Sequence, residues 1–73
     1  MLQVGIILHR AKSGRLIIRM SRELRTGAMI LDDEGKRLGK VVELIGPVRA
    51  PYASVSLSTG RSGKAGEPAF VER

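Results

Sequence analysis

The chain alternates short apolar runs with glycine-rich turns, and no helical period is sustained for ten residues. Apolar and polar residues that alternate over four to eight positions are typical of a strand with one buried face. Glycine suits the turns between such strands, because it adopts positive φ without strain. The pattern therefore predicts an all-β chain, with strands at about residues 3–9, 16–20, 29–31, 37–45, 53–57 and 69–71.

Alternation also predicts which side chains of a strand share one face. In the first strand Val4, Ile6 and Leu8 share one parity and are expected on one face. The second and fifth strands alternate cleanly. In the fourth strand the alternation is imperfect, which predicts either a bulge near Gly39 or burial of both faces.

Six short strands in 73 residues raise the problem of exposed sheet edges, which invite aggregation. Closing the sheet on itself removes those edges, and frequent glycines suit tight barrel corners. A chain of this length has room for one modest core. We therefore expect a single domain, residues 1–73, that forms a small six-stranded, closed or nearly closed antiparallel β-barrel.

The charge balance favours an acidic partner. Thirteen Lys and Arg against seven Asp and Glu give a net charge of +6 and a pI near 10.9. Among acidic partners, RNA is the one that this charge favours most. Net charge by itself indicates only a long-range attraction. The longest apolar run is three to four residues, and no charged-then-apolar leader opens the chain. We expect a cytoplasmic protein that does not enter a membrane.

Few residues suit catalysis or metal binding. The chain has no cysteine, and its one histidine, His9, is followed by Arg10 with no serine nearby in the sequence. The acidic run Asp32–Glu34 lacks the ligand spacing of a calcium loop. Gly35–Lys40 and Gly60–Lys64 resemble phosphate-binding loops but lack the following Ser or Thr and the helix. We expect no catalytic residue, no metal and no cofactor.

A basic segment is the first candidate site. From Arg10 to Arg25 there are six basic residues and one acid, Glu23. Concentrated positive charge suits contact with a nucleic-acid backbone, but the segment has no aromatic residue on which bases could stack. The alternative is a solvated rim that keeps a small barrel soluble. The candidate nucleic-acid residues are Arg10, Lys12, Arg15, Arg22 and Arg25.

A proline-restricted loop, residues 46–52, is the second candidate site. It displays apolar and aromatic groups on a stiff backbone, so little entropy is lost when it docks on a partner. The alternative is a barrel corner in which Tyr52 plugs one end. The candidate partner-binding residues are Gly46, Pro47, Val48, Pro51 and Tyr52.

The order of motifs resembles the Gar/Naf family of H/ACA ribonucleoprotein proteins. The motifs are GAMILD at 27–32, EGKRLGKV at 34–41, ELIGPV at 43–48 and PYASV at 51–55. The resemblance extends over nearly the whole chain and is strongest over residues 27–57. The run through Gly-Pro-Val and Pro-Tyr in this order is its most specific part.

The resemblance implies a six-stranded barrel that is not itself an enzyme. In this family the Gar subunit docks on a dyskerin-type pseudouridine synthase, whose guide RNA selects the uridine of a ribosomal RNA substrate. It influences how the synthase's thumb loop loads and releases substrate RNA. By the same resemblance, the matching positions within residues 46–52 would face the synthase. Eukaryotic members carry glycine-arginine-rich tails, whereas residues 1–73 contain no such stretch, so by this resemblance we expect the archaeal form.

Two alternatives remain open from the sequence. One is a barrel that binds structured RNA directly through the basic segment, with no protein partner. The other is an assembly factor of the Naf type, which occupies the same face of the synthase and is later exchanged. Guide and substrate RNA would be further partners within an assembled particle, and the sequence does not decide whether the barrel contacts them directly.

Overall fold

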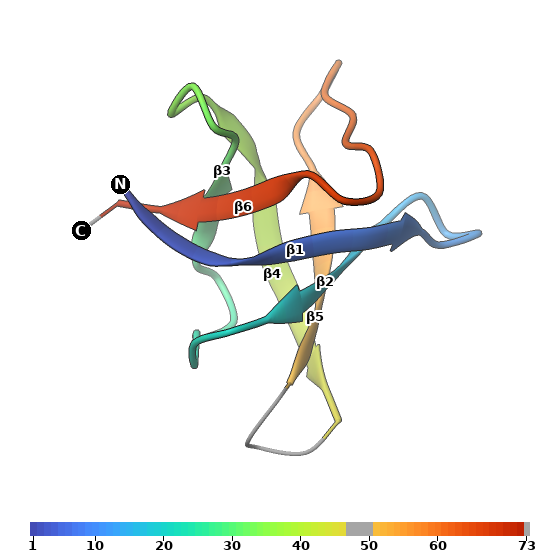
Figure 1. Ribbon diagram of the computed structural model, residues 1–73. Helices are drawn as coiled ribbons and strands as arrows, with labels where there is room; N and C mark the ends of the chain where they lie inside the picture. The colour runs from blue at the N-terminus through green and yellow to red at the C-terminus, as the bar shows by residue number, and fades with distance from the viewer. Residues whose placement is uncertain (47–50, 73) are drawn as a thin grey trace.

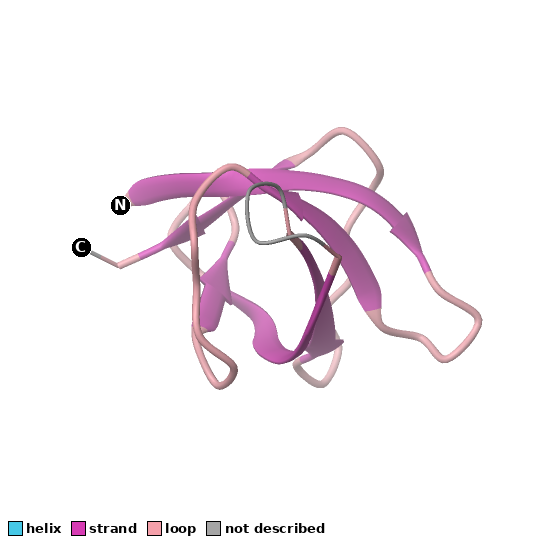
Figure 2. Cartoon of the chain, turned by 90° about the horizontal axis from the view of Figure 1, so that it is seen from below, coloured by secondary structure: helices cyan, strands magenta, loops and turns pink. Residues whose placement is uncertain are grey.

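The computed structural model describes residues 1–46 and 51–72, and within them it contains strands, turns and loops but no helix (Figures 1 and 2). Three predicted strands begin and end where expected, and the other three differ by one or two residues. The strands are β1 Leu2–Arg10, β2 Leu16–Met20, β3 Met29–Leu31, β4 Arg37–Ile45, β5 Tyr52–Leu57 and β6 Pro68–Val71.

The strands form a closed barrel in the order β1-β2-β5-β4-β3-β6, and every neighbouring pair is antiparallel. The predicted six-stranded antiparallel barrel is therefore confirmed. The ring is not equally strong all round. β1 forms several residue pairs with each of its neighbours, β2 and β6. β3 and β6 are joined in the described chain by a single pair, Leu31 with Phe70.

Aliphatic side chains from all six strands fill the interior. The clean alternation of β2 is confirmed, since Leu16, Ile18 and Met20 are all buried. Val55 on β5 packs against the same cluster. The buried cluster consists of Val4, Ile7, Leu16, Ile18, Met20, Ile30, Leu38, Val41, Ala53, Val55 and Ala69.

The prediction that Val4, Ile6 and Leu8 share one face of the first strand is wrong. Val4 and Ile7 are buried, whereas Ile6 and Leu8 are exposed. The cause is two bulges in β1. Val4 is an extra residue in the pairing with β6, and Leu8 is an extra residue in the pairing with β2. Each bulge shifts the alternation by one position and so exchanges the faces.

The predicted bulge in the fourth strand is confirmed. Leu38 is the extra residue where β4 pairs with β3, next to Gly39. A second bulge lies at Val42, where β4 pairs with β5. Leu38 is buried and Val42 is exposed. The bulges bend β4, which helps a short sheet to close.

Glycine at two strand positions allows the backbones to approach closely. A Cβ atom at Gly39 would collide with the carbonyl oxygen of Ser56 and lie 2.8 Å from Val55 Cγ1. A Cβ atom at Gly5 would collide with the carbonyl oxygen of Arg19 in the same way. Both contacts involve backbone atoms, which cannot rotate away.

The carboxylate of Asp32 ties the end of β3 to the loop before β6. Its Oδ1 accepts hydrogen bonds from the amides of Glu34 and Lys36, each at 2.9 Å. Its Oδ2 accepts a hydrogen bond from Arg61 Nη2 in an ion pair. The Lys36 amide above all, together with Arg61 and the Glu34 amide, lowers the pKa of Asp32 below its usual 3.8.

Replacing Gly39 by Ala should lower the free energy of unfolding by about 2 kcal/mol, because the added methyl group overpacks the contact between β4 and β5. Urea denaturation measures this loss. Lys40→Ala is the control, because Lys40 follows Gly39 directly and its side chain is exposed. This substitution should lower the free energy of unfolding by less than about 0.5 kcal/mol. Equal losses in the two variants would contradict a tight contact at Gly39.

The pH dependence of the free energy of unfolding should show how much the ionised Asp32 carboxylate contributes to stability. Since its pKa is lower in the folded chain, the ionised form stabilises the fold above the unfolded pKa, and this contribution is lost as the pH falls through the folded pKa. Between about pH 4 and pH 2 the wild type should therefore lose stability more steeply than Asp32→Asn in urea denaturation. Asp33→Asn, which removes the adjacent charge, should follow the wild type. A wild-type slope equal to that of Asp32→Asn would contradict this role.

Candidate functional site

The structure describes three of the five predicted partner-binding residues, and they differ in exposure. Gly46 and Tyr52 are exposed at the ends of the loop between β4 and β5. Pro51 is buried, and its carbonyl accepts a hydrogen bond from the Met20 amide at 3.0 Å, so it anchors the loop to β2. The predictions for Pro47 and Val48 fall outside the described residues.

Tyr52 is a surface residue. Its side chain is 36% exposed and lies outside the buried cluster, so it does not plug the barrel as the alternative proposed. Gly46 has a positive φ of 93°, and a Cβ atom there would lie 3.4 Å from Tyr52 Cδ2. The ring therefore lies against the Gly46 backbone, which holds it in place.

A row of exposed side chains crosses four adjacent strands at this corner. Ile6 on β1 pairs with Arg19 on β2, and Arg19 pairs with Tyr52 on β5. Tyr52 pairs on its other side with Ile45 on β4. Residues directly opposite on antiparallel strands turn their side chains to the same face. These four residues are all exposed, and we call them the Tyr52 row.

Other apolar groups lie near the Tyr52 row. Leu8 and Val42, the two outward bulge residues, are exposed further along β1 and β4. Leu44 is 40% exposed but pairs with the buried Ala53, so it faces the opposite side of the sheet, where it lines a small pocket of about 120 Å³ with Gly46 and Pro51. Exposed apolar groups gathered at one place are typical of a protein interaction surface.

Arg19 gives the Tyr52 row a charge at its centre. It is exposed, and within the described chain it forms no ion pair. Arg19 lies between Ile6 and Tyr52, its partners on the adjoining strands. A surface that fits the row would therefore be apolar and would carry a carboxylate opposite Arg19.

The basic segment does not form one patch. Arg10, Lys12 and Arg15 lie at the β1–β2 turn, whereas Arg22 and Arg25 lie in the loop that follows β2. These two segments are at opposite ends of β2 (Figure 1). All five side chains are exposed. The predicted basic site is therefore divided into two separate groups.

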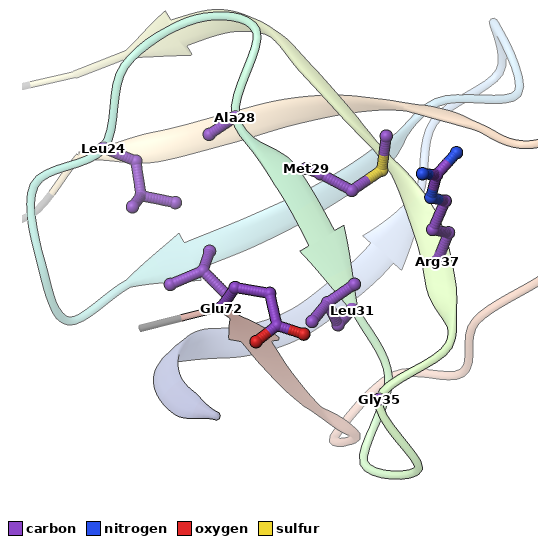
Figure 3. A pocket seen from close by; sticks show the side chains of 8 residues that line it. Leu24, Ala28, Met29, Leu31, Gly35, Arg37 and Glu72 are labelled. Atoms are coloured by element: carbon purple, nitrogen blue, oxygen red, sulfur yellow. The ribbon is translucent and has the colours of Figure 1, made fainter.

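A groove of about 560 Å³ lies at the seam between β3 and β6 (Figure 3). Leu24, Ala28 and Leu31 give it an apolar lining, and Arg37 and Glu72 lie at different sides of it. Glu72 is the one carboxylate in its lining, which contains no Ser, Thr, Cys, Lys or His. The groove thus offers apolar contacts rather than a catalytic constellation.

The described residues bring no titratable groups together in a way that suits metal binding. They contain no group of three His, Asp or Glu side chains that could hold an ion. His9 is exposed at the end of β1, opposite Ile17. Over residues 1–46 and 51–72 there is also no helix of the length and hydropathy needed to cross a bilayer.

Sequence reasoning named Tyr52 as a candidate but not the other three residues of its row. Ile6 was expected on one face with Val4 and Leu8, and Arg19 was grouped with the basic segment. Ile45 and Leu44 are adjacent in the fourth strand, where the alternation is imperfect. The sequence therefore did not predict on which face of the strand the Ile45 side chain lies. Pairing across strands brings these residues together, and no local signal in the sequence marks that pairing.

Proteins from two archaea are similar to this chain. An uncharacterized protein of Methanothermobacter thermautotrophicus is 42% identical over 55 residues, which are 75% of this chain and 60% of that protein. An uncharacterized protein of Methanocaldococcus jannaschii is 41% identical over 49 residues, 67% of this chain and 59% of that protein. No family model matches the chain. The matched part thus spans about three fifths of the length of these archaeal relatives.

Proposed function

We propose that the protein is a non-catalytic accessory subunit of an H/ACA guide-RNA particle, in which the barrel docks on a dyskerin-type pseudouridine synthase. Bound there, it promotes the loading and release of substrate RNA during modification of ribosomal RNA. The proposed interface is Gly46 together with the Tyr52 row. The sequence resemblance adds Pro47 and Val48.

The observation that carries this proposal is the Tyr52 row. Tyr and Arg are the residue types that most often dominate binding energy at protein interfaces, and here Tyr52 and Arg19 are adjacent on neighbouring strands. Ile6 and Ile45 flank them with exposed apolar surface. Because all four lie on paired strands, their backbone is ordered before docking, which reduces the entropic cost of binding.

Three further observations support the proposal. The closed six-stranded barrel is the fold that the resemblance to the Gar/Naf family implies. The stretch of strongest resemblance, residues 27–57, contains both Ile45 and Tyr52. The archaeal origin of the relatives agrees with the archaeal form of that family, which has no glycine-arginine-rich tail.

Titration of the protein into the purified synthase, without RNA, should give one-to-one heats with a negative heat-capacity change from apolar burial. Tyr52→Ala should weaken binding by about 2 kcal/mol, which is roughly a 30-fold increase in Kd. The barrel should remain folded, because Tyr52 is not part of the buried cluster.

Ser56→Ala is the matched control for Tyr52→Ala. Ser56 is exposed on the same strand and has the same parity, but it lies at the other end of β5. Its substitution should leave the Kd for the synthase unchanged. Equal Kd values for the wild type and Tyr52→Ala would remove Tyr52 from the interface. An absence of binding heat with the wild-type protein would refute the accessory-subunit proposal.

The proposed role in RNA loading and release predicts a kinetic signature. Adding the protein to a reconstituted particle should raise the rate of pseudouridine formation over many turnovers, while the rate for substrate already bound changes little. Tyr52→Ala should require a higher concentration for the same effect. Equal multiple-turnover rates with and without the protein would contradict this role.

A further inference from the structure

A second surface, chemically unlike the Tyr52 row, lies at the other end of β2 and β5. It is a polar hollow of about 370 Å³ between the β1–β2 turn and the β5–β6 loop. We propose that this hollow binds phosphate groups of an RNA backbone. Its principal lining residues are Arg10, Arg15, Arg61, Ser13, Ser56 and Ser58.

Two of the arginines flank the β1–β2 turn. Arg10 ends β1 and pairs with Leu16, so Arg15 immediately precedes the paired strand. A Cβ atom at Gly14 would lie 3.7 Å from Arg10 Nη2, which places the Arg10 guanidinium close to the backbone of the turn. Both arginine side chains are exposed and form no ion pair in the described chain. Their charges are therefore free to meet an anion.

The third arginine comes from the β5–β6 loop. Arg61 forms an ion pair with Asp32 through its Nη2 atom. The Nε atom of Arg61 is buried and has no hydrogen-bond partner among the described residues. The ion pair fixes the position of the guanidinium at the edge of the hollow. It also offsets part of the positive charge, so Arg10 and Arg15 supply most of the attraction.

The lining suits phosphate rather than a base or an apolar group. Arginine presents several N–H donors in a planar fork that matches phosphate oxygens, and serine hydroxyls add further donors. None of the residues that line the hollow is acidic or aromatic. Without an aromatic platform, contact with the backbone is favoured over stacking with bases.

The hollow and the Tyr52 row share no residue and lie at different ends of β2. Arg15 precedes β2 and Arg19 lies four residues further along it, which corresponds to about 13 Å of extended strand. RNA in the hollow and a protein on the Tyr52 row would therefore contact different ends of the barrel. This inference goes beyond the proposed function and does not rest on it.

The test measures binding of a fluorescently labelled single-stranded oligouridine by anisotropy over a series of KCl concentrations. One double variant is Arg10→Ser with Arg15→Ser. The matched control is Arg22→Ser with Arg25→Ser, which removes the same charge at the opposite end of β2. All four side chains are exposed, and urea denaturation checks that both double variants remain folded.

Loss of two phosphate contacts should reduce the slope of log K against log salt by about 1.4, from about 0.7 for each contact. The Arg10/Arg15 variant should show this reduction, with affinity at least roughly tenfold weaker at low salt, while the Arg22/Arg25 variant stays near the wild type. Tyr52→Ala should bind the oligouridine as the wild type does, even if its binding to the synthase is lost.

Several outcomes would overturn the proposal. Equal losses in the two double variants would assign RNA binding to net charge rather than to the hollow. Absence of salt-dependent binding by the wild type would leave the hollow without an RNA ligand. Displacement of the RNA by inorganic phosphate at constant ionic strength would assign the hollow to a free phosphate. Equally strong competition by polyglutamate would assign it to an acidic protein.

Discussion

Four extra residues in β1 and β4 determine how the rest of this barrel is arranged: Val4, Leu8, Leu38 and Val42. Each bulge bends its strand and shifts the alternation of side chains by one position. The bending helps six short strands to close. The shift moves Ile6 away from the core and leaves it beside Arg19. The exposed apolar surface is therefore a consequence of how the barrel closes.

The barrel keeps its two candidate sites apart. β2 and β5 each contribute to both, because the Tyr52 row crosses one end of these strands and the arginine-lined hollow adjoins the other. Close backbone contacts at Gly5 and Gly39 hold the strands that flank this pair. The separation of the two sites is thus set by paired backbone rather than by loops. Such a scaffold can present an apolar surface and a cationic surface to two partners at once.

Prediction from the sequence was correct for a strand whose apolar and polar residues alternate without interruption. Leu16, Ile18 and Met20 alternate without interruption, so both the bounds and the inward face of β2 were predicted correctly. It failed for the faces of β1, because Ile6 is as apolar as the core residues and hydrophobicity does not reveal a bulge. Arg61 was missed for another reason. It lines the hollow from the β5–β6 loop, far along the chain from Arg10 and Arg15, and no local pattern in the sequence indicates that approach.

The single residue pair between β3 and β6 makes that seam the place where thermal motion opens the ring most readily. The ion pair of Asp32 with Arg61 opposes the opening, because it joins the end of β3 to the loop before β6. Once open, β3 and β6 would offer edges of only three and four residues, which are too short to recruit a strand from a second molecule effectively. The weakest seam of the barrel is thus also the one whose opening exposes the least surface for aggregation.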